Sequence, residues 1–292
     1  MIGAAVDVGS NSVHLLVANV LDGRLETLID VSEQLGLGDF VDSEGSIPEE
    51  PQRGLVYLLR EYRDVALAQG AQQVTFVGTE PLRRATNGRA VADLVERETG
   101  IPLQILDKRQ EGELAFVGVT GGTARATSVM IVDIGGGSSQ VVFYDPQQGV
   151  RVAGLEIGSK RLSSEIVSHD PPTTGEIVRL RSRAAEAVAA LPDATPARVV
   201  FVGGTATNIT HLRPLAAAEF DALFDILTTV PAAELADRYV LRPRRALQLA
   251  AGAALAEAIL HRYGLEAAEV SDASLRDGAI IAAAQDRTLS PT

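Results

Sequence analysis

The sequence contains no cysteine, and aromatic residues make up only 4% of its 292 residues. Without cysteine the protein has no disulfide, thiolate nucleophile or zinc–sulfur site, which fits a cytoplasmic location. No apolar run reaches the roughly 18–20 residues that span a bilayer, because the best candidate, 249–260, is rich in alanine and contains Glu257. No basic stretch precedes an apolar core at the N-terminus. We therefore expect neither a secretory signal nor a membrane partner.

Positive charge is scarce in the first part of the sequence. The formal net charge is -12, and residues 1–50 carry ten acidic residues and one basic residue. The remaining residues are near balance, so a local basic cleft can still hold a polyanion against the average field. Binding of a nucleic acid polymer over a broad face is disfavoured, since it requires many cations on one surface.

Two pairs of segments repeat at almost the same spacing. Residues 5–12 and 131–138 align at an offset of 126, and each is an apolar strand, a turn opening with Asp, and the start of a second strand. Residues 74–78 and 199–203 align at an offset of 125. Two matches at one spacing indicate a duplication, and the period is too long for a solenoid.

The duplication predicts an α/β protein of two similar halves, 1–122 and 123–292. Each half is expected to contain a hairpin, a third strand, a helix, a buried strand and further helix. Glycines at 121 and 122 suggest a hinge at the boundary. Helical periodicity is predicted at 53–69, 91–98, 174–191, 206–212 and 244–263.

Three turns rich in small residues follow predicted strands, at 7–12, 133–138 and 203–207. Glycine lets the backbone approach a ligand closely, and successive amides can then form an anion-binding nest. A single turn of this kind is equally consistent with a tight hairpin, but three together favour phosphate. The candidate phosphate-binding residues in these turns are Ser10, Asn11, Gly135, Gly136, Gly137, Ser138, Gly204 and Thr205.

Two of the turns open with an aspartate, Asp7 and Asp133. Carboxylates, water and phosphate oxygens are the ligands that Mg²⁺ prefers, so both residues are candidate metal ligands, directly or through water. The alternative is that each aspartate accepts hydrogen bonds from its own turn.

These turns, together with 270–272 followed by Leu275 and Arg276, resemble in order and sequence the exopolyphosphatase / guanosine pentaphosphate phosphohydrolase family, within the actin, Hsp70 and sugar-kinase superfamily. The resemblance covers nearly the whole chain. It implies two duplicated RNase-H-like (actin-like) halves with an interdomain cleft that holds the active site, and it allows a homodimer. Larger family members add a C-terminal helical domain, which we do not expect here. Without that domain less surface is available to bind a long polymer, so a preference for short phosphate chains follows as a hypothesis.

The resemblance also implies a catalytic glutamate that activates water, and the matching residue is Glu111. A carboxylate near the junction of the halves suits that role, although a solvated glutamate at a helix start is the alternative. Arg83 matches a family arginine, and its guanidinium fork suits phosphate. The sequence departs from the family at Gln140, where glutamate is usual, and in the acidic run before Glu111.

We therefore expect a Mg²⁺-dependent hydrolase that releases terminal phosphate from inorganic polyphosphate or from guanosine pentaphosphate. A non-catalytic polyphosphate- or nucleotide-binding protein is an alternative, because Gln140 and the altered run could reflect lost chemistry. An ATP-dependent kinase on the same fold is another alternative, because one fold hosts several chemistries.

Overall fold

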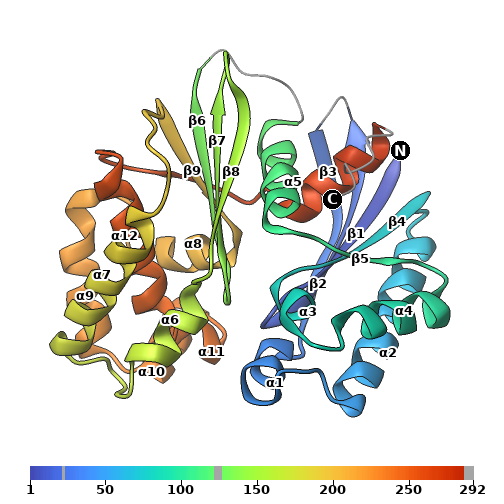
Figure 1. Ribbon diagram of the computed structural model, residues 1–292, viewed down its shortest axis with the longest axis horizontal. Coiled ribbons are helices and arrows are strands. Elements are labelled where there is room, and N and C mark those ends of the chain that lie inside the picture. Colours follow the sequence, from blue (N-terminus) through green and yellow to red (C-terminus); the bar gives the residue numbers. More distant parts are fainter. Residues whose placement is uncertain (22–23, 122–126, 286–292) are drawn as a thin grey trace. The chain divides into compact units, whose positions relative to one another are not determined.

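The computed structural model describes residues 1–21, 24–121 and 127–285. The chain divides into two compact units, shown in Figure 1. Unit 1 comprises Met1–Ala124 and Ala273–Thr292, and unit 2 comprises Arg125–Asp272. The predicted second half, 123–292, thus differs from unit 2 at its end, because the last helix packs with unit 1. The predicted boundary glycine at 122 lies outside the described residues.

Unit 1 is built on a five-stranded sheet in the order β3-β2-β1-β4-β5. Strands β2 and β3 run antiparallel in the hairpin, whereas β4 pairs parallel with β1. Its elements are β1 (Ile2–Val8), β2 (Ser12–Leu21), β3 (Arg24–Gln34), α1 (Leu37–Glu44), α2 (Glu49–Ala68), β4 (Gln73–Gly78), α3 (Glu80–Arg84), α4 (Gly88–Thr99), β5 (Leu103–Ile105), α5 (Lys108–Thr120) and α13 (Leu275–Ala284).

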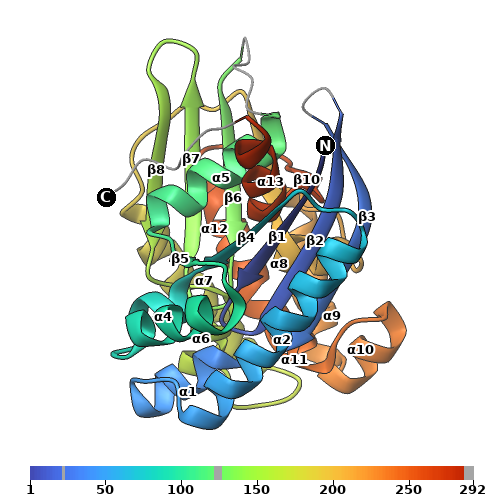
Figure 2. The same cartoon turned by 90° about the vertical axis from the view of Figure 1, so that its right-hand side faces the viewer.

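Both faces of this sheet are covered by helices. Figure 2 shows α2 in front of the sheet, and α2 and α4 bury the larger apolar cluster, with Leu55 and Phe76 fully buried. On the other face, α5 and α13 contribute Leu114 and Ile280 to a second cluster. The two helices pack closely because Gly278 has no side chain: a Cβ there would lie 1.8 Å from the Leu114 carbonyl oxygen. The result is a three-layer α/β/α unit.

Unit 2 repeats the same topology with the strand order β10-β9-β6-β7-β8. The hairpin strands are again antiparallel and the next strand is again parallel to the first, which confirms the predicted duplication. Its elements are β6 (Val129–Ile134), β7 (Ser139–Asp145), β8 (Gly149–Leu155), α6 (Ser159–Ile166), α7 (Thr174–Ala189), β9 (Arg198–Val202), α8 (Gly203–Thr210), η1 (Ala217–Glu219), α9 (Phe220–Thr229), α10 (Ala232–Tyr239), α11 (Pro243–Ala246), α12 (Leu249–Arg262) and β10 (Glu269–Ser271).

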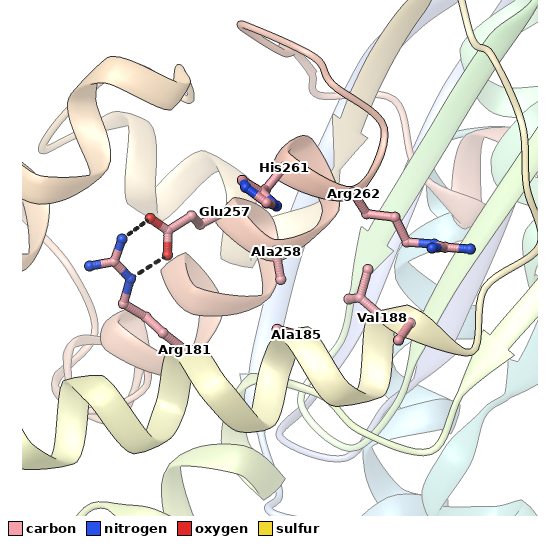
Figure 3. A pocket seen from close by; sticks show the side chains of 8 residues that line it. Arg181, Ala185, Val188, Glu257, Ala258, His261 and Arg262 are labelled. Atoms are coloured by element: carbon pink, nitrogen blue, oxygen red, sulfur yellow. Dashed lines mark hydrogen bonds and ion pairs between the residues drawn. The ribbon is translucent and has the colours of Figure 1, made fainter.

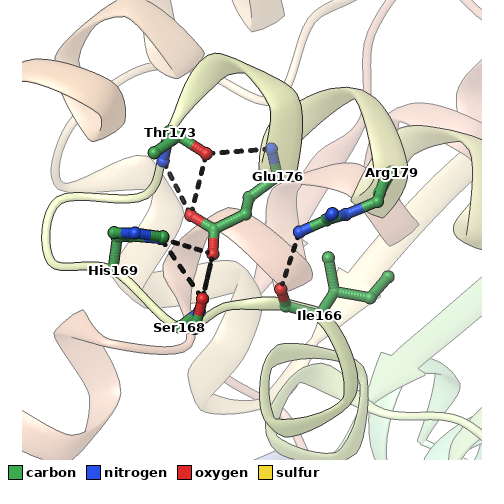
Figure 4. A network of polar contacts seen from close by, with 6 residues as sticks. All are labelled: Ile166, Ser168, His169, Thr173, Glu176 and Arg179. Atoms are coloured by element: carbon green, nitrogen blue, oxygen red, sulfur yellow. Dashed lines mark hydrogen bonds and ion pairs between the residues drawn. The ribbon is translucent and has the colours of Figure 1, made fainter.

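Local signals explain some of the helix boundaries. The start of α7 is a capping box in which Thr173 and Glu176 satisfy each other's backbone amides, as Figure 4 shows. The helix predicted at 244–263 is instead two helices, α11 and α12. Between them the Gln248 amide bonds the Arg245 carbonyl three residues back, so the α-helical pattern is interrupted there. None of the described helices is long and apolar enough to cross a membrane.

Candidate functional site

In unit 1, Asp7 near the end of β1 has one carboxylate oxygen that no described residue satisfies. Asp7 lies at the end of β1, and the turn closes where the Gly9 amide donates to the Ser12 carbonyl at 3.1 Å. Asp7 as a residue is partly exposed, but its Oδ1 is buried and has no hydrogen-bond partner among the described residues. Burial raises the pKa of Asp7 to about 6, and the charge of Arg276 opposes this rise only in part. An unsatisfied acceptor of this kind fits a cation or a water held by one.

Arg276 reaches this turn from α13, at the far end of the sequence. It forms an ion pair with Asp30 of β3, with 2.5 Å between Nη1 and Oδ1. Its side chain is 13% exposed, so the guanidinium is held at a fixed place beside the sheet. The family resemblance identified Arg276 within a motif, but its proximity to Asp7 follows only from the packing of α13 on β1.

The predicted base and the predicted phosphate-binding arginine contact each other directly. Glu111 lies in the first turn of α5, and only 8% of its side chain is exposed. Arg83 donates through Nη1 to the Glu111 carboxylate and, at 2.7 Å, to the Leu106 carbonyl. The arginine Nη2 is buried and has no partner within the described part of the chain. Arg83 therefore holds Glu111 and keeps one donor available for an anion.

A capping box fixes the helix that carries Glu111. The Asp107 side chain accepts from the Gln110 amide at 2.7 Å, and the Gln110 side chain accepts from the Asp107 amide at 3.0 Å. The box satisfies amides of the first turn that have no partner inside the helix. Glu111, the next residue, is consequently presented from an ordered helix start.

Ser10 and Asn11, predicted to bind phosphate, lie in the turn that follows Asp7, and both are buried. Their carbonyl oxygens accept the amides of Gly38 and Gly36, at 2.9 and 3.0 Å, so the segment before α1 supports the turn. The Ser10 hydroxyl donates to Glu80 Oε2 at 2.5 Å. The Ser10 amide has no partner in the described residues, and it remains available to a ligand.

In unit 2, the glycine-rich turn is fixed by the start of α6. The amide of Ser159 donates to the Gly135 carbonyl at 2.9 Å, and the amide of Lys160 donates to the Gly136 carbonyl at 2.9 Å. The carbonyl oxygens of Gly135 and Gly136 thus accept hydrogen bonds from α6, whereas the amides of the turn do not take part in these contacts. Those of Gly136 and Gly137 have no partner among the described residues. This is the donor arrangement of an anion-binding nest.

Asp133 and the start of α8 lie side by side. Gly203 opens α8 at a φ of +81°, and a Cβ on it would lie 2.8 Å from Asp133 Oδ1. No side chain caps this helix, so the amides of its first turn, including those of the predicted residues Gly204 and Thr205, are available to an anion.

Arg245 is a site residue that our sequence reasoning missed. Its Nη2 lies 3.8 Å from the position of a Cβ on Gly204, at the start of α8. Burial lowers the pKa of Arg245, as does the charge of Arg242, while the negative charge of Asp133 raises it. The residue lies in a run of three arginines among four residues, and that sequence alone does not tell which one faces α8.

The two aspartates have equivalent neighbours in the two units. Asp7 is paired with His14 across β1 and β2, and Asp133 with Gln140 across β6 and β7. In each case the residue opposite the aspartate contacts the serine that ends the turn. His14 Nε2 is 2.7 Å from Ser12 Oγ, and Gln140 Nε2 donates to Ser138 Oγ at 3.2 Å. His14, on β2, thus contacts the end of the Asp7 turn.

The structure therefore groups the predicted residues by unit. Five of them belong to unit 1 and are linked by contacts of α3 with α5 and with the turn after β1: Asp7, Ser10, Asn11, Arg83 and Glu111. The remaining candidates belong to unit 2 and surround the glycine-rich turn and α8. Among the described residues no three acidic or histidine side chains form a cluster that could hold a metal on its own. Any cation here would depend on one carboxylate, water and substrate oxygens, as Mg²⁺ sites commonly do.

A separate cavity of about 540 Å³ lies on unit 2 between α7 and α12, as Figure 3 shows. Alanine and valine side chains form its wall, and Arg181 makes a two-point contact with Glu257 at its edge. None of the predicted site residues lines it. The candidate site thus consists of turns and helix starts rather than this cavity.

Comparison with known proteins finds relatives and solved structures that resemble nearly the whole chain. Exopolyphosphatase 1 of Mycobacterium bovis is 29% identical, over 94% of this chain and 86% of that protein. Exopolyphosphatase 2 of Mycobacterium tuberculosis is 28% identical, over 94% of this chain and 96% of that protein. The crystal structure of the Aquifex aeolicus member of the Ppx/GppA family matches with a TM-score of 0.86 at 27% identity, covering 99% of each chain.

The predicted fold class, two duplicated actin-like α/β halves, is confirmed, and the described residues show no additional helical domain. A model of the Ppx/GppA phosphatase family matches residues 16–286. That match begins within β2, after the Asp7 turn, and includes the glycine-rich turn at 133–138 and the start of α8. The chain belongs to the Ppx/GppA phosphatase family.

Proposed function

We propose that this protein hydrolyses the terminal phosphate of inorganic polyphosphate, with Glu111 as general base. The observation that carries the proposal is the ion pair between the buried Glu111 and the partly buried Arg83. The guanidinium orients the Glu111 carboxylate, and a carboxylate can take a proton from water. The exopolyphosphatases among the relatives support this substrate class, and guanosine pentaphosphate is the related alternative.

Arg83 has two tasks in this proposal. Its Nη1 orients Glu111, and its unpartnered Nη2 is available to a phosphate oxygen. Attack of water on phosphorus needs the base, the water and the phosphate in a fixed arrangement, and positioning accounts for much of the acceleration in phosphoryl transfer. The guanidinium fork suits this double contact better than an ammonium group, because its donors are held in one plane.

Unit 2 contributes donors for phosphate. The amides of Gly136 and Gly137, the hydroxyl of Ser138 and the first turn of α8 with Arg245 are all suited to phosphate oxygens. Gly135 belongs to the same glycine-rich turn as Gly136 and Gly137, and Gly204 and Thr205 belong to the first turn of α8. Unit 1 adds the amides of its first turn, at Ser10 and Asn11.

Asp7 and Asp133 are the residues proposed to hold Mg²⁺. The buried, unsatisfied Oδ1 of Asp7 fits this role, and each aspartate offers the one or two carboxylate oxygens that Mg²⁺ usually takes from protein. When bound, the ion neutralises negative charge on the phosphate oxygens.

The test is phosphate release from polyphosphate with MgCl₂, comparing the natural protein with Glu111→Gln. The carboxamide keeps the shape of the side chain but cannot act as the base, so we expect release to fall by at least about 100-fold. Glu113→Gln is the matched control, because Glu113 lies on the same helix and pairs with the exposed Arg109. Release by Glu111→Gln at the natural rate would show that another group is the base. Binding without release by the natural protein would favour a non-catalytic polyphosphate-binding protein.

A further inference from the structure

Glu80 is a buried carboxylate that the proposed reaction does not use. Only 4% of its side chain is exposed. Its Oε2 accepts the Ser10 hydroxyl at 2.5 Å, and its Oε1 accepts Arg84 Nη1 at 2.6 Å. Arg84 also contacts Asp42, which helps to fix the guanidinium. Glu80 therefore lies between the substrate-binding turn and a charged partner.

The contact with Glu80 determines the direction of the Ser10 hydroxyl. A serine has one hydroxyl proton, and an ionised carboxylate can only accept. Because Ser10 gives its proton to Glu80, its oxygen presents lone pairs elsewhere and cannot donate to phosphate. Ser138 in unit 2 differs, because its oxygen accepts from Gln140 and its own proton remains available for an anion.

Glu80 also connects the turn to the base. It begins the five-residue helix α3, which carries Arg83 as well. The residue before it, Thr79, donates through its amide and its hydroxyl to the Val8 carbonyl, each at 3.2 Å. One short helix thus contacts the Asp7 turn at its start and Glu111 through Arg83.

We propose that Glu80 is a positioning residue for phosphate hydrolysis: by holding Ser10 and α3 together, it fixes the Asp7 turn relative to the Arg83–Glu111 pair. This inference rests on the proposed function. It changes the role predicted for Ser10, which binds phosphate through its backbone amide and not through its hydroxyl.

A double-mutant cycle tests the proposal with the whole chain. The proteins are the natural one, Ser10→Ala, Glu80→Ala and the double variant, each measured for kcat and KM of phosphate release from polyphosphate with MgCl₂. Affinity for tripolyphosphate is measured by calorimetry in the same series with Glu111→Gln added, so that turnover does not interfere. Glu80→Gln is included because it keeps an acceptor for Ser10, and melting temperatures identify any variant that fails to fold.

We expect each single substitution to lower kcat by about 10- to 100-fold, because small displacements of reacting groups are costly. The double variant should lose no more than the worse single variant, since both break one contact. Glu80→Gln should recover part of the rate. KM and tripolyphosphate affinity should change by less than about threefold, because the hydroxyl makes no phosphate contact. Asp42→Asn, which removes the negative charge of the exposed partner of Arg84, should keep kcat within about twofold.

Two results would overturn the inference: tripolyphosphate affinity more than about tenfold weaker in Ser10→Ala, or losses of kcat that multiply in the double variant. Failure of the proposed function looks different, because the natural protein would then release no phosphate. In that case the affinities measured in the Glu111→Gln series still decide whether the Ser10 hydroxyl contacts phosphate, and absence of any binding rejects both proposals.

Discussion

Gln140 lies directly opposite Asp133 across strands β6 and β7, and its side-chain amide donates to Ser138. Residues in this relation have their Cβ atoms about 4.5–5.5 Å apart. The position next to the predicted metal ligand is therefore occupied by a neutral donor. The amide contacts the end of the glycine-rich turn and adds no negative charge beside Asp133.

Gln140→Glu should strengthen binding of Mg²⁺ in unit 2. A second carboxylate beside Asp133 adds a hard oxygen ligand, but without a cation the two like charges repel. We expect a melting temperature below that of the natural protein without Mg²⁺ and a larger increase when Mg²⁺ is added. Gln104→Glu, at an exposed position of β5, is the matched control. Equal responses of the two variants to Mg²⁺ would contradict the prediction.

Asp7→Asn should stabilise the protein at neutral pH while it impairs activity. The pKa of Asp7 rises from 3.8 to about 6 in the folded protein because the carboxylate is buried. The folded state therefore holds a proton that the unfolded state has lost, and stability falls as pH rises through this interval. The loss is at most about 3 kcal/mol, and it is smaller in practice because Asp7 is partly exposed.

Urea unfolding at pH 4 and pH 7.5 measures this effect. Asp7→Asn should resemble the natural protein near pH 4 and exceed it in stability at pH 7.5. Phosphate release by the variant should be low at both values. If Asp7→Asn is less stable than the natural protein at pH 7.5, the burial of an unsatisfied carboxylate is not the dominant effect.

Arg83→Lys should lower kcat/KM by about 10- to 100-fold, equivalent to about 1.4–3 kcal/mol of transition-state stabilisation. Lysine keeps the positive charge but cannot contact Glu111, the Leu106 carbonyl and phosphate together. Steady-state kinetics on polyphosphate give the value. Arg89→Lys, at an exposed position of α4, should change it less than about twofold. If Arg83→Lys left kcat/KM unchanged, a positive charge alone would be sufficient at this position, without the guanidinium contacts.

Arg245→Ala should act mainly on binding. The side chain lies at the start of α8, next to the amides proposed to hold phosphate, so its loss should raise KM for polyphosphate by roughly tenfold. Arg244→Ala is the matched control, since Arg244 is exposed in the same short helix. If both substitutions raised KM equally, the arginines would act through their combined positive charge, and Arg245 would make no specific contact with phosphate.

Glu176→Gln should destabilise unit 2 without a direct effect on catalysis. Burial raises the pKa of Glu176, but hydrogen bonds from His169, Thr173 and Ser168 outweigh it and lower the pKa below its usual value. The network in Figure 4 therefore stabilises the protein above the ordinary glutamate pKa and is lost as pH falls. We expect the variant to lose about 1–2 kcal/mol at pH 7, measured by urea unfolding. An unchanged unfolding midpoint would contradict this role.

Local patterns in the sequence predicted the features that depend on neighbouring residues. The repeat around Asp7 and Asp133 predicted the duplicated hairpins, and two of the three small-residue turns are found where strands end. The third, at 203–207, is the start of helix α8, which directly follows β9. Alternating apolar and polar residues, and glycines that mark turns, are patterns within a few residues, so one sequence is enough to detect them.

The missed features depend on long-range packing. Arg276 approaches Asp7 only because α13 packs on β1, more than two hundred residues away along the chain. Arg245 lies beside Gly204, which is forty-one residues earlier in the chain. Glu80, at the start of α3, contacts Ser10, which lies 70 residues away in the sequence. No local pattern encodes such contacts, so Arg245 and Glu80, and the proximity of Arg276 to Asp7, are identified only in the folded structure.

The return of the C-terminal segment to unit 1 has a consequence for the order of folding. Unit 2 is continuous in sequence, whereas unit 1 needs Leu275 and Ile280 of α13 to complete its second apolar cluster. During synthesis, unit 2 can therefore close its core before unit 1 does, although its sequence emerges later. Until the last helix leaves the ribosome, one face of the unit 1 sheet lacks part of its apolar cover, and a nascent chain arrested before α13 should be a preferred target for chaperones.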